Sequence, residues 1–541
     1  MKTKSFLLST LVTFMFAGCS SDDAREGNIP SGELNGKAYL SLSLQSHTST
    51  TRAENVVEKP GSSGESKAGT VRVLLFDEED VCLDVVNFDG LTVGNSGGTS
   101  AEGTGTPEAA ASEAQLVPEK TKKVFVVINP YTDGNKGWNL AAETVKGKPW
   151  SAINTSIEAV IANVTTTNQF MMTSAGKGAG IEGALTNVTV HKPGGYTNEA
   201  INQAKTEAKN NPAEINVDRL SAKVELAVKE AFTTKPDGAK FTFGGWELSV
   251  TNKSVKLYSE LITYDNATNG AVYRRDNNYL LSEQPVINTG NKKTDEANLM
   301  AAFDYLKNID NESDDIPAVV QTNGSSLYCL ENTMEAKAQQ LGFTTKVVVK
   351  ATYTPSGLNE NSSYFSWKGN YYTLDQLKTE YLKHSDGSGL KVDLPIFLKK
   401  AGIMTQEQFD GDQDTKNSVV ASLSEGATAT QLNAKTGIIG RFCAVRYYHA
   451  SVCYYDVLIR HDQNVTTKMA LGRYGVVRNN WYHLELQSVS GPGTPWIPDP
   501  SDPDPTNPTP PGTDDDEADA YISVKITINP WTYWTQGVDL H

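Results

Sequence analysis

The chain has 541 residues, of which 38% are hydrophobic, with 22 tyrosines and 8 tryptophans, so it can form more than one folded core and is not a disordered chain. Its formal net charge of −16 repels phosphate backbones and argues against nucleic acid as a partner. Glycine, threonine, asparagine and serine are frequent, and strand-like segments recur, which favours an all-β protein.

The first residues have the pattern of an export signal. Lys2 and Lys4 precede an apolar stretch at 5–16 that is too short to cross a bilayer. The stretch ends in Phe16-Ala17-Gly18-Cys19, which is typical of a bacterial lipobox, and an acidic tether follows. We therefore expect Cys19 to carry a lipid. The alternative is an ordinary signal peptide with an accidental cysteine. No later apolar run is long enough for a transmembrane helix.

A short strand and an exposed loop follow. Leu40, Leu42 and Leu44 alternate with polar residues, which predicts a strand with one apolar face. The segment 47–68 is rich in Ser, Thr, Gly and Pro and is expected to be a loop. Its single arginine lies in Thr51-Arg52-Ala53, and proteases cut in loops of this kind. Arg52 can equally be a plain solvated loop residue.

Strand-like segments then continue through most of the chain. A continuous apolar run at 124–128 ends at Asn129-Pro130, as expected for a buried strand. A fresh set of strands begins at Val217, so we place a domain boundary at 216/217. Segments that look helical are expected to decorate the second sheet, at 370–384 and 394–409.

The end of the chain combines two unlike segments. Residues 492–520 repeat Asp-Pro pairs and end in an acidic run, which predicts an extended, semi-rigid spacer that cannot itself fold. A strand pattern follows at 521–541, with these apolar residues: Ile522, Val524, Ile526, Ile528, Trp531 and Trp534.

An isolated apolar strand must dock somewhere, because a free one exposes unpaired backbone groups and large side chains. Burying four β-branched residues and a tryptophan contributes on the order of 7–15 kcal/mol before ordering costs. The spacer could reach roughly 80 Å, and hence another molecule, by strand addition. The Leu40–Leu44 strand would block the acceptor edge until a cut after Arg52 released it. The alternative is that the terminal strand folds back onto its own second domain.

These segments give the predicted organisation of the chain. It consists of a signal peptide with lipobox (1–19), a propeptide with the blocking strand (20–52), an N-terminal β-sandwich (53–216), a C-terminal β-sandwich (217–491), a spacer (492–520) and a donor strand (521–541).

Patterns typical of enzymes and metal sites fail on context. The glycines at 178–183 and 94–98 have the spacing of a dinucleotide fingerprint and of a nucleophile elbow, but both lie in loop-like sequence. Asp410, Asp412 and Asp414 lack the glycine and glutamate that a calcium loop needs. We predict no catalytic residue, cofactor or metal. The remaining cysteines allow two disulfides or buried free thiols: Cys82, Cys329, Cys443 and Cys453.

Several motifs follow one another along the chain: the Cys19 lipobox, Val124–Pro130, Phe170–Met172, Asp218–Val224, Tyr328–Asn332, Tyr474–Asn479 and, after the Asp-Pro spacer, Ile526–Trp531. In this order they resemble the Bacteroidetes fimbrilin family, in particular its short-fimbria (Mfa-like) major-subunit branch. The resemblance covers nearly the whole chain.

This resemblance implies two tandem transthyretin-like β-sandwich domains with a few short helices. It also implies transport as an outer-membrane lipoprotein, maturation by an Arg-specific protease at Arg52-Ala53, and polymerisation by C-terminal strand exchange. The expected location is a surface fimbria, and the expected roles are adhesion, coaggregation and biofilm formation. The expected partners are other copies, accessory subunits, and host or bacterial surface ligands. Two alternatives stay open: an accessory or tip subunit, and a monomeric surface lipoprotein that binds glycan or host protein.

Overall fold

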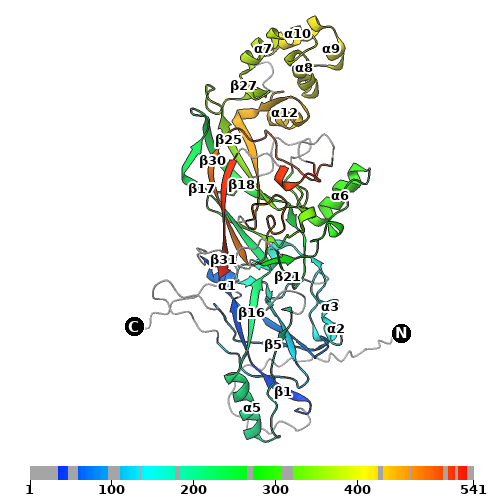
Figure 1. The fold of residues 1–541 in the computed structure, drawn as a ribbon, viewed down its shortest axis with the longest axis vertical. Helices are drawn as coiled ribbons and strands as arrows, with labels where there is room; N and C mark the ends of the chain where they lie inside the picture. The colour runs from blue at the N-terminus through cyan, green and yellow to red at the C-terminus, as the bar shows by residue number, and fades with distance from the viewer. Residues whose placement is uncertain are drawn as a thin grey trace, which may run out of the picture.

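The computed structural model describes residues 34–46, 59–95, 110–133, 136–176, 183–264, 272–307, 321–424, 431–462, 465–503, 510–517 and 522–532. The molecule is elongated, with the earlier strands at one end, the later sheets in the middle and a helical insertion at the other end (Figure 1). Strands predominate and helices are few and mostly short, so the prediction of an all-β fold is confirmed.

The N-terminal half is built on one large sheet in the order β5-β4-β8-β14-β16-β2-β6, with β15 paired to β8. The strands are β2 (Leu42–Ser46), β4 (Val71–Phe76), β5 (Cys82–Phe88), β6 (Val93–Asn95), β8 (Lys123–Ile128), β14 (Met172–Ser174), β15 (Thr186–Asn187) and β16 (Ala213–Arg219). A separate antiparallel pair consists of β1 (Lys37–Leu40) and β7 (Gln115–Pro118).

Both faces of this sheet are covered, which explains the continuous apolar run of β8. Val124, Val126 and Ile128 enter one core, where Leu40 of β1 and Val117 of β7 also pack. The alternate residues enter a second core, which is covered by short helices: α2 (Ala142–Val145), α3 (Trp150–Ile153) and α4 (Ile161–Val164). The longer α5 (Asn198–Asn210) packs on β1.

The C-terminal half is a sandwich of two sheets. One has the order β24-β17-β30-β31-β3 and the other β18-β25-β29. The strands are β3 (Lys59–Pro60), β17 (Ser221–Thr234), β18 (Lys240–Ser249), β24 (Ser326–Leu330), β25 (Lys346–Thr354), β29 (Val452–Leu458), β30 (Asn480–Val489) and β31 (Ile522–Thr532). Side chains of both sheets, including Trp246, Val349 and Leu484, form one core between them.

The change from one sheet to the next occurs at Leu220. The predicted boundary at 216/217 falls inside β16, which still pairs with β14 and β2, whereas β17 starts at Ser221 in the second sheet. Alternation marks strands but not the sheet to which each belongs, so it cannot resolve a boundary between two consecutive strands. The division into two domains stays a prediction.

Short strand pairs and one helix lie between these sheets. The pairs are β9 (Thr132–Asp133) with β10 (Lys136–Gly137), β11 (Ile157–Glu158) with β20 (Ser254–Val255), β12 (Thr165–Thr166) with β13 (Gln169–Phe170), β19 (Thr251–Asn252) with β23 (Phe303–Asp304), and β21 (Glu260–Thr263) with β22 (Val272–Arg275). The helix α6 (Lys292–Ala302) projects to one side (Figure 1).

A helical insertion with its own core lies at the end of the molecule farthest from β1 (Figure 1). It combines a three-stranded sheet, β26 (Tyr364–Trp367), β27 (Asn370–Tyr372) and β28 (Val445–Tyr448), with α7 (Leu374–Lys383), α8 (Leu390–Lys400), α9 (Gln406–Asp410), α10 (Gln413–Ser422) and α12 (Ala434–Ile439). Asp412 caps α10 by accepting a 2.8 Å hydrogen bond from the Thr415 N–H, which accounts for part of the acidic triplet.

The spacer differs from the prediction of an extended linker. Its described residues lie against the C-terminal sandwich, where Trp496 and Ile497 are buried. The Tyr454 and Thr494 backbones exchange hydrogen bonds of 2.8 and 2.9 Å, and the Leu341 N–H donates to the Thr513 carbonyl at 2.9 Å. Proline prevents a continuous ladder of hydrogen bonds, but residues between prolines can still form isolated bridges. The two buried apolar residues attach the segment to the sandwich, and the average composition of the spacer gives no sign of them.

Candidate functional site

The predicted blocking strand is buried in the N-terminal half. Leu40 ends β1, whereas Leu42 and Leu44 lie in β2, and all three are at most 1% exposed. β2 runs parallel to β16 on one side and to β6 on the other. The three leucines share one core, as the alternation predicts. The role of this strand as a removable blocker stays a prediction.

The predicted donor strand forms β31 in the sheet of its own chain. It runs antiparallel to β30 over its length, with Leu484 opposite Ile526 and Leu486 opposite Val524. Ile522 and Ile526 are 7% and 8% exposed and enter the sandwich core, against which Val524 is partly buried. Ser523 and Lys525, on the other face, are exposed. The apolar face of β31 is therefore already occupied within one chain.

Several predicted site residues fall outside what the structure describes. Cys19, Arg52, Ala53 and Trp534 lie outside the described residues. The backbones of Ile528 and Trp531 belong to β31, and their side chains are not described. Lipidation and proteolytic maturation therefore remain sequence predictions.

Three of the motifs singled out in the sequence meet at the junction of the two halves. Asp218 forms an ion pair with Arg274 and accepts a 2.9 Å hydrogen bond from Asn479 Nδ2. Arg219, which is fully buried, donates to Asn479 Oδ1 at 3.1 Å and to the Glu65 carbonyl at 2.9 Å. Residues of four distant segments thus satisfy one another's buried polar groups.

A second buried ion pair lies in the same region. Arg478 Nε donates to Glu331 Oε2 at 3.0 Å, and both side chains are 1% exposed. Arg478 also donates to Ser259 Oγ at 2.8 Å and to the Leu257 carbonyl at 3.0 Å. Burial lowers the pKa of the Arg478 guanidinium, and the negative charge of Glu331 opposes this shift. Removing either partner would leave an uncompensated buried charge.

Sequence reasoning found the Asp218, Glu331 and Arg478 segments but missed two of their partners, Glu65 and Arg274. Glu65 is 3% exposed and is held by Lys223 and Tyr328. The Ser62-x-x-Glu65 spacing of a capping box was a usable signal for it. No local pattern marks Arg274, because its partner lies 56 residues away in the sequence.

Acidic residues hold the end of the spacer to its own domain. Asp516 pairs with Arg473 at 2.7 Å, and Asp502 pairs with Arg441 at 2.7 Å. The buried Asp515 carboxyl accepts a 2.5 Å hydrogen bond from Thr344 Oγ1. Burial raises the pKa of Asp515 to about 8, and the negative charges of Asp516 and Asp514 add to this shift, whereas Thr344 and Lys346 oppose it. Asp515 is therefore protonated at neutral pH.

This raised pKa predicts a pH-dependent attachment of the spacer. A carboxyl group that is neutral in the folded state contributes stability that is fully present below the pKa of the unfolded chain and is lost as the pH rises toward 8. Between pH 5 and 9 we expect a loss on the order of 2–4 kcal/mol. Asp515→Asn should remove most of this dependence, and the exposed Asp514→Asn should not. Hydrogen exchange at 510–517 measures it, and equal pH profiles for both variants would contradict the assignment.

The four cysteines that the structure describes are free thiols. Cys329 and Cys453 are buried in the C-terminal core, and Cys82 is buried in the N-terminal half. Burial raises the pKa of Cys329 to about 12 and that of Cys82 and Cys453 to about 11. The sequence left two disulfides or free thiols open, and the structure has free thiols. The high pKa values make the buried thiols unreactive.

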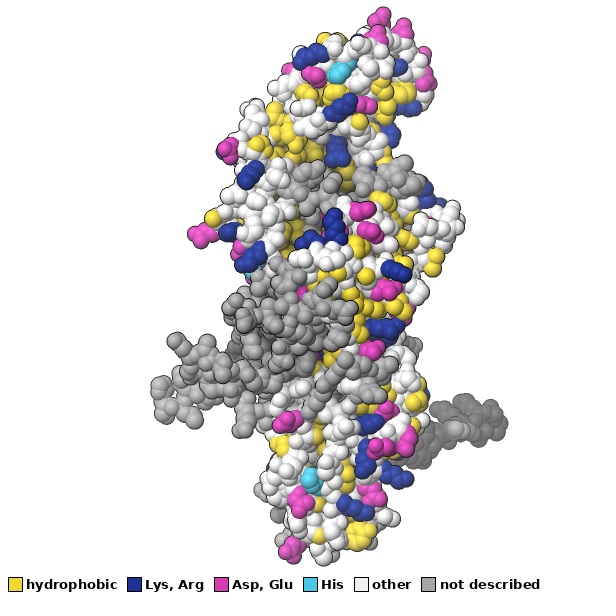
Figure 2. All heavy atoms as spheres, in the orientation of Figure 1, with side chains coloured by type: hydrophobic (Ala, Val, Ile, Leu, Met, Phe, Trp, Pro, Cys, Tyr) yellow, Lys and Arg dark blue, Asp and Glu magenta, His cyan; other side chains and the backbone are white. Residues whose placement is uncertain are grey.

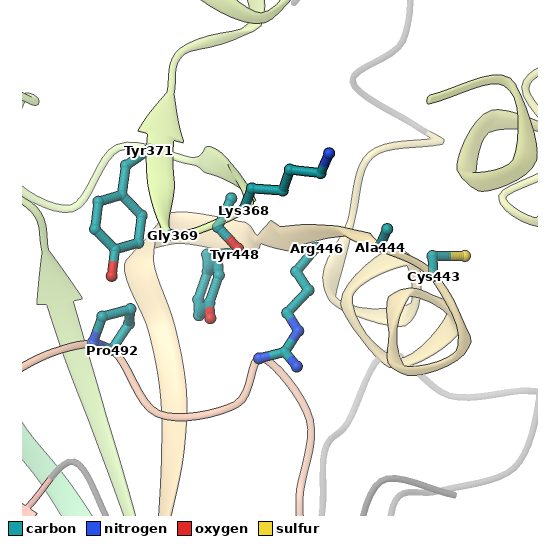
Figure 3. Close-up of a pocket in the computed structure, with 9 residues that line it drawn as sticks. Lys368, Gly369, Tyr371, Cys443, Ala444, Arg446, Tyr448 and Pro492 are labelled. Carbon is teal, nitrogen blue, oxygen red and sulfur yellow. The ribbon is translucent and has the colours of Figure 1, made fainter. Parts of the chain in front are cut away.

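A cavity of about 300 Å³ lies between the helical insertion and the sandwich, lined by Ser366, Lys368, Tyr371, Cys443, Arg446, Tyr448 and Pro492, among others. The charged ends of Lys368 and Arg446 point in different directions, and the Cys443 thiol points away (Figure 3). No charges converge on a ligand there.

Within the described residues, no group of three His, Cys, Asp or Glu side chains is placed to hold a metal ion. Nor does any helix in that part of the chain have the length and apolarity to span a membrane.

A family model describing the C-terminal part of the type IV major fimbrial subunit protein, fimbrillin, matches residues 446–537. Over these residues, the chain is similar to the fimbrillin family. The matched segment includes Arg478 and Asn479 of the junction, the spacer, and both β30 and β31. The fimbrilin pattern therefore contains the strand pair that makes up the candidate site. Membership of the short-fimbria branch stays a prediction. No curated protein sequence matches this chain.

Solved structures similar to this chain cover most of its length at low identity. A putative cell adhesion protein from Parabacteroides distasonis is 11% identical, with a TM-score of 0.39 over 92% of this chain and 98% of that chain. A fimbrilin, FimA, from Porphyromonas gingivalis is 15% identical, with a TM-score of 0.35 over 92% and 99%. The tip fimbrial protein Mfa3 from the same organism is 11% identical, with a TM-score of 0.32 over 92% and 100%. The family assignment rests on the match over 446–537.

Proposed function

We propose that this chain is a fimbrilin and serves as a stalk subunit of a cell-surface fimbria. It is exported as an outer-membrane lipoprotein through Cys19, matured by an Arg-specific protease between Arg52 and Ala53, and polymerised by exchange of the C-terminal strand. It acts in adhesion and biofilm formation, with other copies and accessory subunits as partners and with host or bacterial surfaces as targets. It has no enzymatic role.

One observation carries this proposal: the two terminal strands present matching apolar triads. Leu40, Leu42 and Leu44 are buried at alternate positions of one chain segment, and Ile522, Val524 and Ile526 repeat that spacing. A strand with this spacing places its three apolar side chains on one face at the same intervals, because the side-chain period of a strand is two. The proposed exchange is supported because the apolar triad of β31 could occupy the positions that the three leucines leave.

The docking of β31 in its own sheet is compatible with exchange between molecules. A strand that leaves one sheet can replace its lost backbone hydrogen bonds and buried surface by adding to a vacant edge of another sheet. The filament grows because the donor and acceptor surfaces differ, so the head-to-tail contact does not close. The single chain then represents the state before assembly, in which β2 and β31 both pair with strands of their own chain.

Two alternatives remain to be separated from the stalk role. The acidic and basic side chains on the face drawn in Figure 2 are interspersed, and no single-sign patch identifies a surface ligand. An accessory or tip subunit would differ from a stalk subunit in whether both of its ends take part in the filament. A monomeric surface lipoprotein that binds glycan or host protein would keep its N-terminus at Cys19.

The experiment that tests the proposal is the substitution Arg52→Ala. We expect the variant to keep its propeptide and to remain monomeric, because the Leu40–Leu44 strand then cannot leave β16 and β6. N-terminal sequencing should find Ala53 in the unaltered protein. SDS-resistant ladders should be reduced at least about tenfold in the variant.

A conservative control is Arg52→Lys, which keeps the charge but removes the site for an Arg-specific protease. Normal ladders from Arg52→Ala would overturn the maturation step. A lipidated Cys19 that persists on the protein at the cell surface, without ladders, would favour the monomeric lipoprotein.

A further inference from the structure

The segment 59–66, which we call the clasp, lies against the outer edge of β31. Its first part, β3, runs parallel to the end of β31, with Lys59 opposite Trp531 and Pro60 opposite Thr532. Its second part is α1 (Ser63–Ser66), at the lower end of β31 in Figure 1. A strand pair of two residues is too short to hold by itself, so its persistence depends on the anchor of the neighbouring helix.

Glu65 is the anchor of the clasp. Its Oε1 accepts a 2.9 Å hydrogen bond from Lys223 Nζ and a further one from the Tyr328 hydroxyl. Its Oε2 accepts a 2.5 Å hydrogen bond from the Ser62 N–H. Although burial alone would raise the pKa of Glu65, the hydrogen bonds from Tyr328 and Lys223 lower it below the ordinary value. The carboxylate is therefore charged, buried and fully engaged.

Through Lys223, the anchor is linked to β30, the strand next to β31. Lys223 belongs to β17, and its ammonium group lies 3.9 Å from the ring centre of Trp481 in β30. Trp481 is in turn opposite Asn529 of β31. The clasp thus joins β17, β30 and the last third of β31 at one end of the sheet.

The N-terminal half holds the clasp as well. Arg219 Nη2 donates to Ser66 Oγ at 3.2 Å, and the Asn168 N–H donates to the Gly64 carbonyl at 2.7 Å. A Cβ on Gly64 would lie 2.9 Å from Thr167 Cγ2, so the helix is seated closely against this loop. The clasp is therefore fixed at the junction of the two halves and not only to the sheet edge.

We propose that the clasp retains β31 in its own sheet and thereby slows strand donation, with Glu65 as the residue on which this retention depends. The proposal rests on the strand-exchange function above and adds its regulation. Lys59 follows Arg52 by seven residues, so the clasp stays on the chain after the predicted cut. Cleavage lets β2 leave β16 and so frees the acceptor edge, whereas the clasp governs the release of the donor.

The test compares matured Glu65→Gln protein with matured Glu113→Gln protein. Glu113 also pairs with a lysine, Lys209 at 2.6 Å, but on the exposed surface. We expect Glu65→Gln to speed both ladder formation and hydrogen exchange at 522–532 by roughly tenfold or more, because a buried charged hydrogen-bond pair is lost. Glu113→Gln should change neither rate. Rates for Glu65→Gln equal to those of the control would overturn the clasp.

A second variant avoids an unpaired buried lysine. Ser66→Ala removes a hydrogen bond from Arg219 and leaves the Glu65–Lys223 pair intact. It should speed exchange of 522–532 by about two- to fivefold. If Glu65→Gln does not fold, an unchanged rate in Ser66→Ala overturns the proposal.

A disulfide lock separates failure of the clasp from failure of strand exchange. Lys59→Cys with Trp531→Cys places two cysteines at paired backbone positions of β3 and β31. Oxidised protein should assemble at least about tenfold more slowly than the reduced protein. A working lock with an inert Glu65→Gln would overturn the clasp alone. Assembly that is unaffected by a formed lock would overturn strand donation itself.

Discussion

Replacement of Ile522, Val524 and Ile526 by serine should abolish assembly of the matured chain. The two isoleucines are nearly buried and the valine partly so, and transfer of such side chains to water costs about 1.5–3 kcal/mol each. The triple variant therefore loses about 4–8 kcal/mol of docking free energy, wherever β31 docks. A domain is stabilised by only about 5–15 kcal/mol in total, so no stable ladder is expected.

The opposite face of the same strand provides the control. Ser523 and Lys525 are exposed, and Ser523→Ala with Lys525→Gln should leave ladder formation and the urea midpoint unchanged. The triple variant should also lower the urea midpoint of the monomer, because Ile522 and Ile526 belong to the C-terminal core. Normal ladders from the serine variant would rule out β31 as the donor.

A truncation before β31 is a less selective test than the serine variant. Removing residues 520–541 also bares the edge of β30, whose Leu484 and Leu486 face β31 in the ladder. The shortened chain would therefore lose stability as well as a donor strand. If the truncated chain failed to assemble, the cause could be lost stability or the missing donor strand. The serine variant and its control on the opposite face of β31 separate these two causes.

The comparison of sequence and structure shows what alternation can and cannot establish. The pattern of Ile522, Val524 and Ile526 predicted a strand with one apolar face, and that face is buried. The pattern says nothing about the edge with which a strand pairs, because ladder hydrogen bonds are made by the backbone and are common to all sequences. The return of β31 to its own sheet therefore stayed one of two alternatives.

The spacer and the junction were hidden for different physical reasons. Composition predicted an extended spacer, but Trp496 and Ile497 anchor it, and two apolar residues do not change an average over a long segment. At the junction, Lys223 and Glu65 are 158 residues apart, and Asp218 and Arg274 are 56 apart. Charged residues at buried strand positions indicate that partners exist, and only the fold shows which they are.

Substitution of Arg478 by methionine should be among the most destabilising changes at the junction. It leaves Glu331 buried without its cation, and such a loss costs about 3–5 kcal/mol. The double variant Arg478→Met with Glu331→Gln should recover at least about 2 kcal/mol of this, because no uncompensated charge remains and the amide can still bond to Ser259. Urea unfolding of the four proteins in the cycle measures the coupling.

The pair Arg441–Asp502 is the matched control for this cycle, since its side chains are 19% and 24% exposed. Arg441→Met should cost no more than about 1 kcal/mol, because water screens a partly exposed pair. Equal losses of stability for Arg478→Met and Arg441→Met would show that breaking the junction pair leaves no uncompensated buried charge.

A larger loss at Arg478 has a consequence for assembly. The junction fixes the acceptor strand β16 relative to the sheet that releases β31, so its loss should slow ladder formation even when both terminal strands are intact.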